Sequence, residues 1–238
     1  MKNKVAIVVC VHGNEQYGLE VCKKLPAFFS FFVANEKAVK ENKRFIEGDL
    51  NRCFPGNRNG NHEERLAYKL VNDLSDFDYV IDLHSTSQNC PLFGIITKPN
   101  EEKIKLAKFL GVKKLVIVNP SYASGKALID FVKCGISLEV GPHFREENFK
   151  EALNSINLLL EERTSQNQLE IYKVFGIIKG NVSMVLMENF QRIKKGQPIA
   201  VKEDGSIERA RFDFIAVLTG KKNYNNVIGL ACKMLSKD

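Results

Sequence analysis

The sequence predicts an α/β fold, in which a mixed, mainly parallel sheet is flanked by helices and followed by a small β-rich C-terminal subdomain. Up to about Arg163, short β-branched runs alternate with amphipathic stretches, the order expected when helices cover both faces of a parallel sheet. The polar run Thr164–Gln168 ends this pattern. From Leu169 onward, short apolar runs are separated by glycines, which is typical of β-rich units. We therefore expect one domain at residues 1–165 and a small β-rich subdomain at residues 166–238.

The first domain is expected to contain six strands and four helices. Each strand is a short run dominated by apolar residues, and each helix is a stretch with apolar residues at helical spacing. The expected strands are Val5–Val11, Phe29–Ala34, Tyr79–Leu83, Phe93–Thr97, Leu115–Asn119 and Ile136–Val140. The expected helices are Glu15–Lys24, His62–Leu74, Glu101–Leu110 and Glu146–Glu162. In the second helix, Leu66, Leu70 and Leu74 recur every four residues, as one buried helix face requires.

Length and hydropathy limit the class of protein. The chain has 238 residues, of which 44% are apolar, so one domain with a small appendage can bury a sizeable core. No run approaches the ~18 consecutive apolar residues of a membrane span. The apolar run after Met1–Lys4 is short and lacks a small-residue cleavage site, so we interpret it as a strand rather than a signal peptide. A cytoplasmic location is the default expectation.

Cysteine usage disfavours two further classes. The six cysteines are scattered along the chain, and no two of them form a CxxC pair. This pattern disfavours a disulfide scaffold and a cysteine-rich zinc finger. We expect buried free thiols instead.

The formal net charge of the chain is +7, from 35 basic and 28 acidic residues. Such a surplus is compatible with nucleic-acid binding and also with small anionic substrates. The lysines are spread along the chain, and no aromatic residues interleave with their small groups in an RNA-binding pattern. We therefore interpret the surplus as solvated surface with a bias towards anionic substrates.

Three side chains that can bind a metal or transfer a proton lie at the ends of expected strands. His12 follows the first strand, His84 follows the third, and Glu139 lies at the end of the sixth. Because ligands of parallel sheets gather at the carboxyl ends of strands, we expect these side chains to meet. Glu15 stands three residues after His12, and residues at this spacing share one face of a helix. We therefore expect Glu15 to point at the same ion as the histidines.

Two imidazoles and one carboxylate form an open zinc site, because they leave a fourth tetrahedral position for water. A zinc ion there would lower the pKa of that water from ~15.7 to about 7. Asp82, two residues before His84 on the same strand face, is expected to orient the imidazole. The alternatives are a surface His12 beside a helix-capping glutamate, and a core His84 bonded to a backbone carbonyl.

A further glutamate and a loop with two arginines complete the candidate site. Glu139 ends an otherwise apolar strand, and a buried carboxylate is costly without a partner. We expect it to act as general base and acid, and the alternative is a structural ion pair. Arg44, Asn51 and Arg52 occupy one loop-like stretch. An arginine fork with an asparagine amide can bind a carboxylate, and the alternative is ordinary surface charge.

Four motifs follow one another in order along the chain: His12–Glu15, Gly48–Arg52, Asp82–His84 and Glu139–Pro142. Together they resemble the aspartoacylase and succinylglutamate desuccinylase family, whose members are relatives of the zinc carboxypeptidases. The resemblance spans roughly residues 5–145. It implies a zinc carboxypeptidase-like core, one zinc ion per chain, and hydrolysis of an amide that joins an acyl group to an acidic amino acid.

The resemblance also implies roles for individual residues. His12, Glu15 and His84 would ligate zinc. Glu139 would activate the attacking water and then protonate the leaving amine. Arg44 would polarise the scissile carbonyl and stabilise its oxyanion, which is typically the largest single electrostatic contribution to such a reaction.

The substrate-binding part of the resemblance is less complete. Asn51 and Arg52 would hold a substrate carboxylate, and Tyr224 is the best candidate for a tyrosine that the family takes from its C-terminal part. A second carboxylate-binding arginine, expected some ten residues before the catalytic glutamate, has no match. That position is Ile129, and the nearest upstream cation is Lys126. A lysine does not replace a bidentate fork, so this departure bears on the substrate rather than on the zinc chemistry.

The predicted function is a zinc-dependent amidohydrolase that acts on carbon–nitrogen bonds other than peptide bonds. Small N-acyl amino acids resembling N-acetyl-aspartate and N-succinyl-glutamate are the leading substrates. No nucleic-acid or membrane partner is expected, and a homo-oligomer is compatible with the sequence. Two alternatives keep the metal: a metallocarboxypeptidase that trims a C-terminal residue, and a deacylase of another small amide. A third alternative is a non-catalytic binding protein on the same scaffold.

Overall fold

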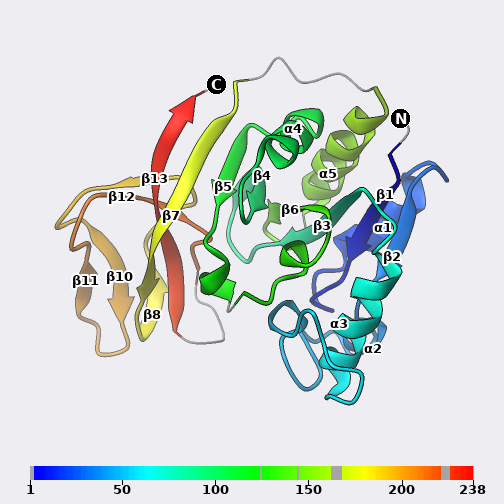
Figure 1. The fold of residues 1–238 in the computed structure, drawn as a ribbon. Helices are drawn as coiled ribbons and strands as arrows, with labels where there is room; N and C mark the ends of the chain where they lie inside the picture. The colour runs from blue at the N-terminus through cyan, green and yellow to red at the C-terminus, as the bar shows by residue number, and fades with distance from the viewer. Residues whose placement is uncertain (1–2, 124, 144, 162–167, 221–225, 238) are drawn as a thin grey trace.

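A mixed sheet of ten strands runs through the part of the chain that the structure describes (Figure 1). The structure is a computed structural model, which describes residues 3–123, 125–143, 145–161, 168–220 and 226–237. The strands of this sheet are β1 Val5–Val9, β2 Ser30–Val33, β3 Tyr79–Ser85, β4 Cys90–Ile96, β5 Lys114–Ile117, β6 Cys134–Gly141, β7 Glu170–Lys179, β9 Arg192–Ile193, β12 Phe214–Val217 and β13 Val227–Lys237. Their order across the sheet is β2-β1-β3-β6-β4-β5-β7-β13-β12-β9. The predicted α/β fold is confirmed.

The six predicted strands correspond to β1 to β6, with small differences at their ends. β1 ends at Val9 rather than Val11, because the chain turns at Cys10, whose φ is +57°. β3 continues past Leu83 to Ser85. His84 therefore lies inside β3 rather than after it.

Strand pairing explains how distant segments of the chain meet. β1 lies between β2 and β3 in parallel, and β3 pairs in parallel with β6. β4 is antiparallel to β6 and parallel to β5. In the β3–β6 pair, His84 is the register partner of Glu139. Because register partners point to the same face of a sheet, this pairing sets two candidate site residues side by side.

Helices cover both faces of the parallel part of the sheet. The described helices are α1 Tyr17–Lys24, α2 Glu36–Lys40, α3 His62–Asp73, α4 Glu101–Phe109 and α5 Glu146–Leu158, with 3₁₀ turns η1 Leu50–Arg52, η2 Pro120–Ala123, η3 Leu128–Asp130 and η4 Leu159–Glu161. Val5, Ile7 and Val9 of β1 pack with residues of α1, α4 and α5. Ala6 and Val8 pack on the opposite face with residues of α3, η1 and η3. β1 is therefore buried on both sides, as parallel strands between helical layers are.

Helix starts follow local capping rules. The side chain of Asn61 accepts a hydrogen bond from the Glu64 N–H, and the Glu64 carboxylate accepts one from the Asn61 N–H. This capping box starts α3 where the sequence predicts a helix. The short helix α2 is not predicted by the sequence, although Asn35 caps it through the Ala38 N–H. Five residues are too few for a helical period of apolar residues to emerge.

The C-terminal region extends the central sheet before it forms a second one. β7 pairs in parallel with β5, and β13, β12 and β9 continue the sheet in antiparallel order. A separate antiparallel sheet contains β8 Val182–Val185, β10 Pro198–Lys202 and β11 Ile207–Arg209. The predicted β-rich character is confirmed, while the division into domains at residues 165 and 166 stays a prediction. None of the helices that the structure describes is both long and apolar enough to cross a membrane.

Candidate metal centre

His12 and Glu15 lie in a tight turn between β1 and α1. The Glu15 N–H donates to the His12 carbonyl at 3.0 Å within this turn. α1 begins only at Tyr17, so the expectation that a shared helix face brings the two side chains together is wrong. The turn does so instead, because it folds the chain back within three residues. Gly13 is required there, since a Cβ at this position would lie 2.2 Å from the carbonyl carbon of Ala38.

The turn and β3 bring the three predicted ligands together. Glu15 Oε1 lies 2.8 Å from His12 Nδ1, and Glu15 Oε2 lies 3.0 Å from His84 Nδ1. The Ser85 N–H also donates to Glu15 Oε2 at 2.9 Å. One donor atom from each of the three predicted ligands lies within 4.8 Å of the others, and all three residues are buried. The two imidazoles thus face a common carboxylate, with their ring centroids 5.0 Å apart.

Each imidazole has a further carboxylate of its own at the ring nitrogen that faces away from Glu15. His12 Nε2 lies 3.1 Å from Asp49 Oδ1, and His84 Nε2 lies 2.8 Å from Asp82 Oδ2. An ionised carboxylate only accepts hydrogen bonds, so a neutral imidazole can donate to only one of its two carboxylate neighbours; with the proton on Nε2, each Nδ1 faces Glu15 as an acceptor. The predicted contact between Asp82 and His84 is present, and Asp49 makes the matching contact to His12. Outer carboxylates of this kind orient metal-ligating imidazoles and raise their basicity.

This set of donors fits a divalent cation. When each imidazole is neutral, its Nδ1 presents a lone pair to the Glu15 carboxylate at a distance where two acceptors repel each other. A proton or a cation between them removes that repulsion. Two imidazole nitrogens and one carboxylate oxygen are ligands that zinc prefers. His12, Glu15 and His84 are the residues that would hold it, with Asp49 and Asp82 behind the histidines.

Electrostatics at the centre also favour a bound positive charge. Burial alone would raise the pKa of Glu15, but His12 and His84 hold it well below its usual range. Burial likewise opposes protonation of His84, but Asp82 and Glu15 raise the pKa of this imidazole well above its usual value. The pKa shifts of Glu15 and His84 both arise from the attraction between buried carboxylates and imidazoles. The same carboxylates would stabilise a bound cation.

Asp49 links the centre to the loop that carries the predicted arginines. Its Oδ1 accepts from the Asn51 N–H at 3.0 Å in addition to His12. Its Oδ2 accepts from Nε and Nη2 of Arg44, at 3.3 and 3.0 Å. Burial opposes ionisation of this carboxyl, but His12, Arg44 and Arg52 lower the pKa of Asp49 far below its usual range. One ionised carboxylate therefore positions an imidazole and a guanidinium together.

The other predicted residues of this loop lie close to Asp49. Arg44 Nη1 lies 3.6 Å from Glu15 Oε1, so its guanidinium reaches the centre itself. The Asn51 side-chain oxygen accepts from the Leu128 N–H at 3.0 Å, so its amide nitrogen keeps donors that a carboxylate can accept. Arg52 Nη1 donates to the Asn51 carbonyl at 2.7 Å. The turn η1 thus presents Asn51 and Arg52 beside Arg44.

Glu139 stands beside His84 on the neighbouring strand. The two residues are register partners in the β3–β6 pair, and Glu139 is half-buried. The hydroxyl of Tyr17 donates to the His84 carbonyl at 3.1 Å. Burial raises the pKa of Tyr17, and the nearby Glu139 carboxylate raises it further. The predicted general base therefore lies next to a candidate ligand, as its proposed role requires.

The structure does not place the predicted tyrosine or a second arginine at the centre. Tyr224 lies outside the residues that the structure describes. Ile129, at the position of the expected arginine, is buried in an apolar cluster and offers no cation. Lys126 is exposed, and its charge opposes the rise to about 11 that burial causes in the pKa of Cys53.

Sequence reasoning missed two carboxylates that organise the site, Asp49 and Glu63. Glu63 is fully buried and accepts three hydrogen bonds from the consecutive N–H groups of residues 46–48, at 2.8, 3.0 and 3.1 Å. The side-chain amide of Asn35 donates a fourth at 3.0 Å. Glu63 thereby holds the loop that leads from Arg44 to Asp49. Asp49 lies within the Gly48–Arg52 motif, which could have indicated it. Glu63 lies in the first turn of a helix, where glutamates are too common for its position to indicate a role in holding the loop.

Comparisons with known proteins place most of the chain in one family. Residues 1–163 match the family described as the succinylglutamate desuccinylase/aspartoacylase catalytic domain. A relative from Trichodesmium erythraeum, named "Probable aspartoacylase", is 31% identical over 166 residues, which cover 59% of this chain and 56% of the relative. A relative from Danio rerio, named "N-acyl-aromatic-L-amino acid amidohydrolase (carboxylate-forming) B", is 28% identical over 170 residues, which cover 58% and 54%. The chain thus spans about half the length of these curated relatives.

Solved structures share the fold over nearly the whole chain. Murine aminoacylase 3 superposes with a TM-score of 0.82 at 21% identity, covering 98% of this chain and 95% of that chain. A succinylglutamate desuccinylase/aspartoacylase from Rhodobacter sphaeroides superposes with a TM-score of 0.78 at 14% identity, covering 98% and 86%. At such identities the likeness shows the fold alone.

Replacing Glu63 with glutamine should lower the free energy of unfolding by about 1–3 kcal/mol. The glutamine would turn an amide donor towards N–H groups that now share two carboxylate oxygens. Urea unfolding of Glu63→Gln measures the loss. Glu101→Gln, which changes an exposed glutamate in the first turn of α4, is the matched control. Equal stability of the two variants would contradict this role of Glu63.

Asp49→Asn should weaken zinc binding by about 10–100-fold. The neutral amide cannot accept from both His12 and Arg44 with the strength of a carboxylate. Competition with a chromogenic chelator measures the affinity. Asp73→Asn, which changes an exposed aspartate of α3, should leave it unchanged. Tight zinc binding by Asp49→Asn would mean that Asp49 does not orient a ligand.

Proposed function

Because the chain belongs to the succinylglutamate desuccinylase/aspartoacylase family, we propose that it is a zinc-dependent hydrolase that cleaves the amide bond of an N-acyl amino acid. One observation carries the proposal. Two imidazoles, each held by its own outer carboxylate, converge on the buried carboxylate of Glu15. Three protein ligands of this kind suit a catalytic rather than a structural zinc ion, since they leave a coordination position open.

In the proposed reaction, the side chains around the centre move one proton and stabilise one charge. Zinc, when bound, supplies a positive charge that polarises the scissile carbonyl and lowers the pKa of water. The Glu139 carboxylate accepts a proton from the attacking water and later donates it to the amine nitrogen as the C–N bond breaks. The Arg44 guanidinium stabilises negative charge on the carbonyl oxygen. The products are a carboxylic acid and an amino acid.

The proposed substrate carries a carboxylate that Asn51 and Arg52 bind. The amide nitrogen of Asn51 and the guanidinium of Arg52 offer donors on the same turn, and charge-assisted bonds of this kind orient a carboxylate. N-acetyl-aspartate-like and N-succinyl-glutamate-like compounds are the leading candidates. The relatives' names add N-acyl aromatic amino acids to the compounds that merit testing. Cytoplasmic location and assembly into a homo-oligomer stay predictions.

Metal analysis of the purified chain, combined with a substrate panel, tests the proposal. We expect about one zinc per chain and turnover of at least one N-acyl amino acid, with loss of activity on chelation and recovery with zinc. The panel includes N-acetyl-aspartate, N-succinyl-glutamate, N-acetyl aromatic amino acids and short peptides. Preference for peptides would favour a metallocarboxypeptidase. A zinc-loaded chain that turns over no amide would favour a binding protein and overturn the proposal.

Glu139→Ala should reduce turnover to background while leaving about one zinc per chain, because a general base outside the ligand set is not needed to hold the metal. Activity assays and metal analysis of the same preparation measure both quantities. Glu147→Ala, which removes an exposed glutamate near the start of α5, should keep both. Loss of zinc from Glu139→Ala would instead identify Glu139 as a ligand.

Arg52→Ala should raise KM for carboxylate-bearing substrates by about tenfold or more, since a charge-assisted hydrogen bond is lost. Its kcat should change less, because the proposed contact is the same in ground and transition states. Steady-state kinetics with the best substrate of the panel separates the two constants. Arg58→Ala, at an exposed position of the same loop, is the control. An unchanged KM in Arg52→Ala would remove Arg52 from the substrate site.

A further inference from the structure

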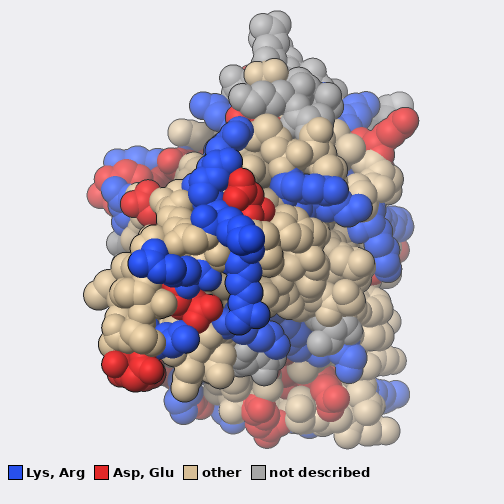
Figure 2. Space-filling model, turned by 90° about the vertical axis from the view of Figure 1, so that its left-hand side faces the viewer, with Lys and Arg blue, Asp and Glu red and all other residues tan. Residues whose placement is uncertain are grey.

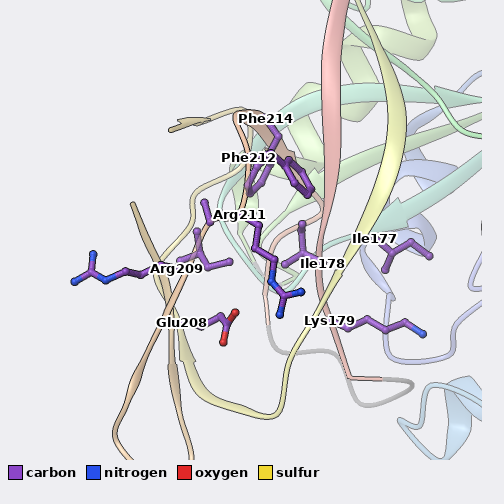
Figure 3. A pocket seen from close by; sticks show the side chains of 10 residues that line it. Ile177, Ile178, Lys179, Glu208, Arg209, Arg211, Phe212 and Phe214 are labelled. Atoms are coloured by element: carbon purple, nitrogen blue, oxygen red, sulfur yellow. The ribbon is translucent and has the colours of Figure 1, made fainter. Parts of the chain in front are cut away.

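A hollow of about 310 Å³ lies in the C-terminal region, where the central sheet meets the three-stranded sheet (Figure 3). The end of β7 forms one wall through Ile177, Ile178 and Lys179. Ile199 of β10, Phe214 of β12 and residues 208–212 form the rest. Small-molecule sites often occupy such junctions between structural layers, at volumes of about 300 Å³ and above. None of these residues belongs to the candidate metal centre.

Isoleucine and phenylalanine side chains form part of the walls of the hollow. Ile199 and Phe214 are buried members of the core of this region. Phe212 is 41% exposed, and its ring centroid lies 5.7 Å from that of Phe214 and 5.6 Å from that of Phe175. An exposed aromatic ring held by two neighbouring rings is a preformed apolar surface, which favours an alkyl or aromatic group in the hollow.

The rim of the hollow is cationic. Lys179, Arg209 and Arg211 line it together with one acid, Glu208; in Figure 3 the charged ends of Lys179 and Arg209 point outward, and that of Arg211 lies between the walls. Glu208 lies 3.0 Å from the ammonium of Lys202, which offsets its charge. In Figure 3 the Arg211 side chain extends from the phenylalanines towards Glu208 and Lys179. The rim therefore carries a net positive charge that an anionic group would neutralise.

The two arginines of the rim differ in their partners. Arg209 Nη1 donates to the Gly196 carbonyl at 2.9 Å. The guanidinium of Arg211 makes no hydrogen bond or ion pair with another residue among those that the structure describes. A guanidinium offers up to five N–H donors and binds a carboxylate through two of them. Arg211 is therefore the donor most available to a ligand in the hollow.

The surroundings extend this positive field. Within this region, the described residues 168–220 and 226–235 contain 9 basic and 6 acidic residues, a net charge of +3. Figure 2 shows Lys and Arg side chains gathered in a long band across this end of the molecule. Like charges in a band attract anions over distances of about 10 Å at moderate salt. An anionic ligand would thus be concentrated near the hollow before it binds.

From the apolar walls, the cationic rim and the available guanidinium, we propose that this hollow binds a small amphiphilic anion, in which one carboxylate is attached to a short apolar chain. The chain lies against Phe212, Phe214 and Ile178, and the carboxylate accepts hydrogen bonds from Arg211. The site is separate from the candidate metal centre and does not depend on the proposed hydrolase activity.

Amide chemical-shift titration of the ¹⁵N-labelled, zinc-loaded full chain with octanoate tests the proposal. We expect saturable shifts in the amides of residues 177–179 and 208–212. The neutral analogue 1-octanol and the headgroup analogue acetate should each bind at least tenfold more weakly, because each lacks one of the two recognised groups. Shifts confined to the surroundings of His12 and His84 would mean that octanoate binds at the metal centre, which would overturn the proposal.

Variants separate a specific site from general attraction to positive charge. Arg211→Gln should weaken octanoate binding by about tenfold or more, and Phe212→Ala should weaken it severalfold. Both positions are exposed, so the amide spectra should otherwise be preserved. Arg192→Gln removes the same charge from an exposed position of β9 outside the hollow. Equal weakening by Arg192→Gln and Arg211→Gln, or no saturable shift in the unchanged chain, would also overturn the proposal.

Discussion

The site depends on one constraint: the carboxylate of Glu15 is buried and must be neutralised away from solvent. Its two oxygens face two imidazoles, and these imidazoles are held from behind by Asp49 and Asp82. Three carboxylates around two imidazoles leave a deficit of positive charge. Arg44, 3.6 Å from Glu15, supplies part of it. A divalent cation would supply the remainder, which is why we propose zinc at this position.

The fold meets this constraint by joining four separate segments at one edge of the sheet. The turn after β1 carries His12 and Glu15, β3 carries His84, and β6 carries Glu139 in register with His84. The fourth segment, the loop before η1, has no regular structure of its own to hold it. Glu63 holds it instead through three backbone N–H groups. The proposed catalytic arginine is therefore positioned by a carboxylate that makes no contact with the centre in the described hydrogen bonds.

The C-terminal strands give the molecule a second chemically distinct region. They continue the central sheet through β7 and then form the three-stranded sheet, and the hollow lies where the two sheets meet. From the sequence, we interpret the surplus of positive charge as solvated surface with a bias towards anionic substrates. Most of this surplus belongs to residues 166–238, whereas His12, Glu15, His84 and Glu139 lie outside this part of the sequence. We therefore propose that the two regions bind anionic groups by different means, one beside a metal centre and the other in an apolar hollow lined by Arg211.

The sequence by itself determined the α/β class, the main strands and helices, and the family, because apolar periodicity and short motifs are local properties of the chain. It also singled out His12, His84 and Glu139, since each lies at a predicted strand end, and Glu15, which follows His12 by three residues. Only the tertiary structure decided how these groups meet. A turn rather than a helix face unites His12 with Glu15, and the β3–β6 register sets Glu139 beside His84. Glu63 was beyond sequence reasoning, because its role exists only through N–H groups that folding brings to it from another segment.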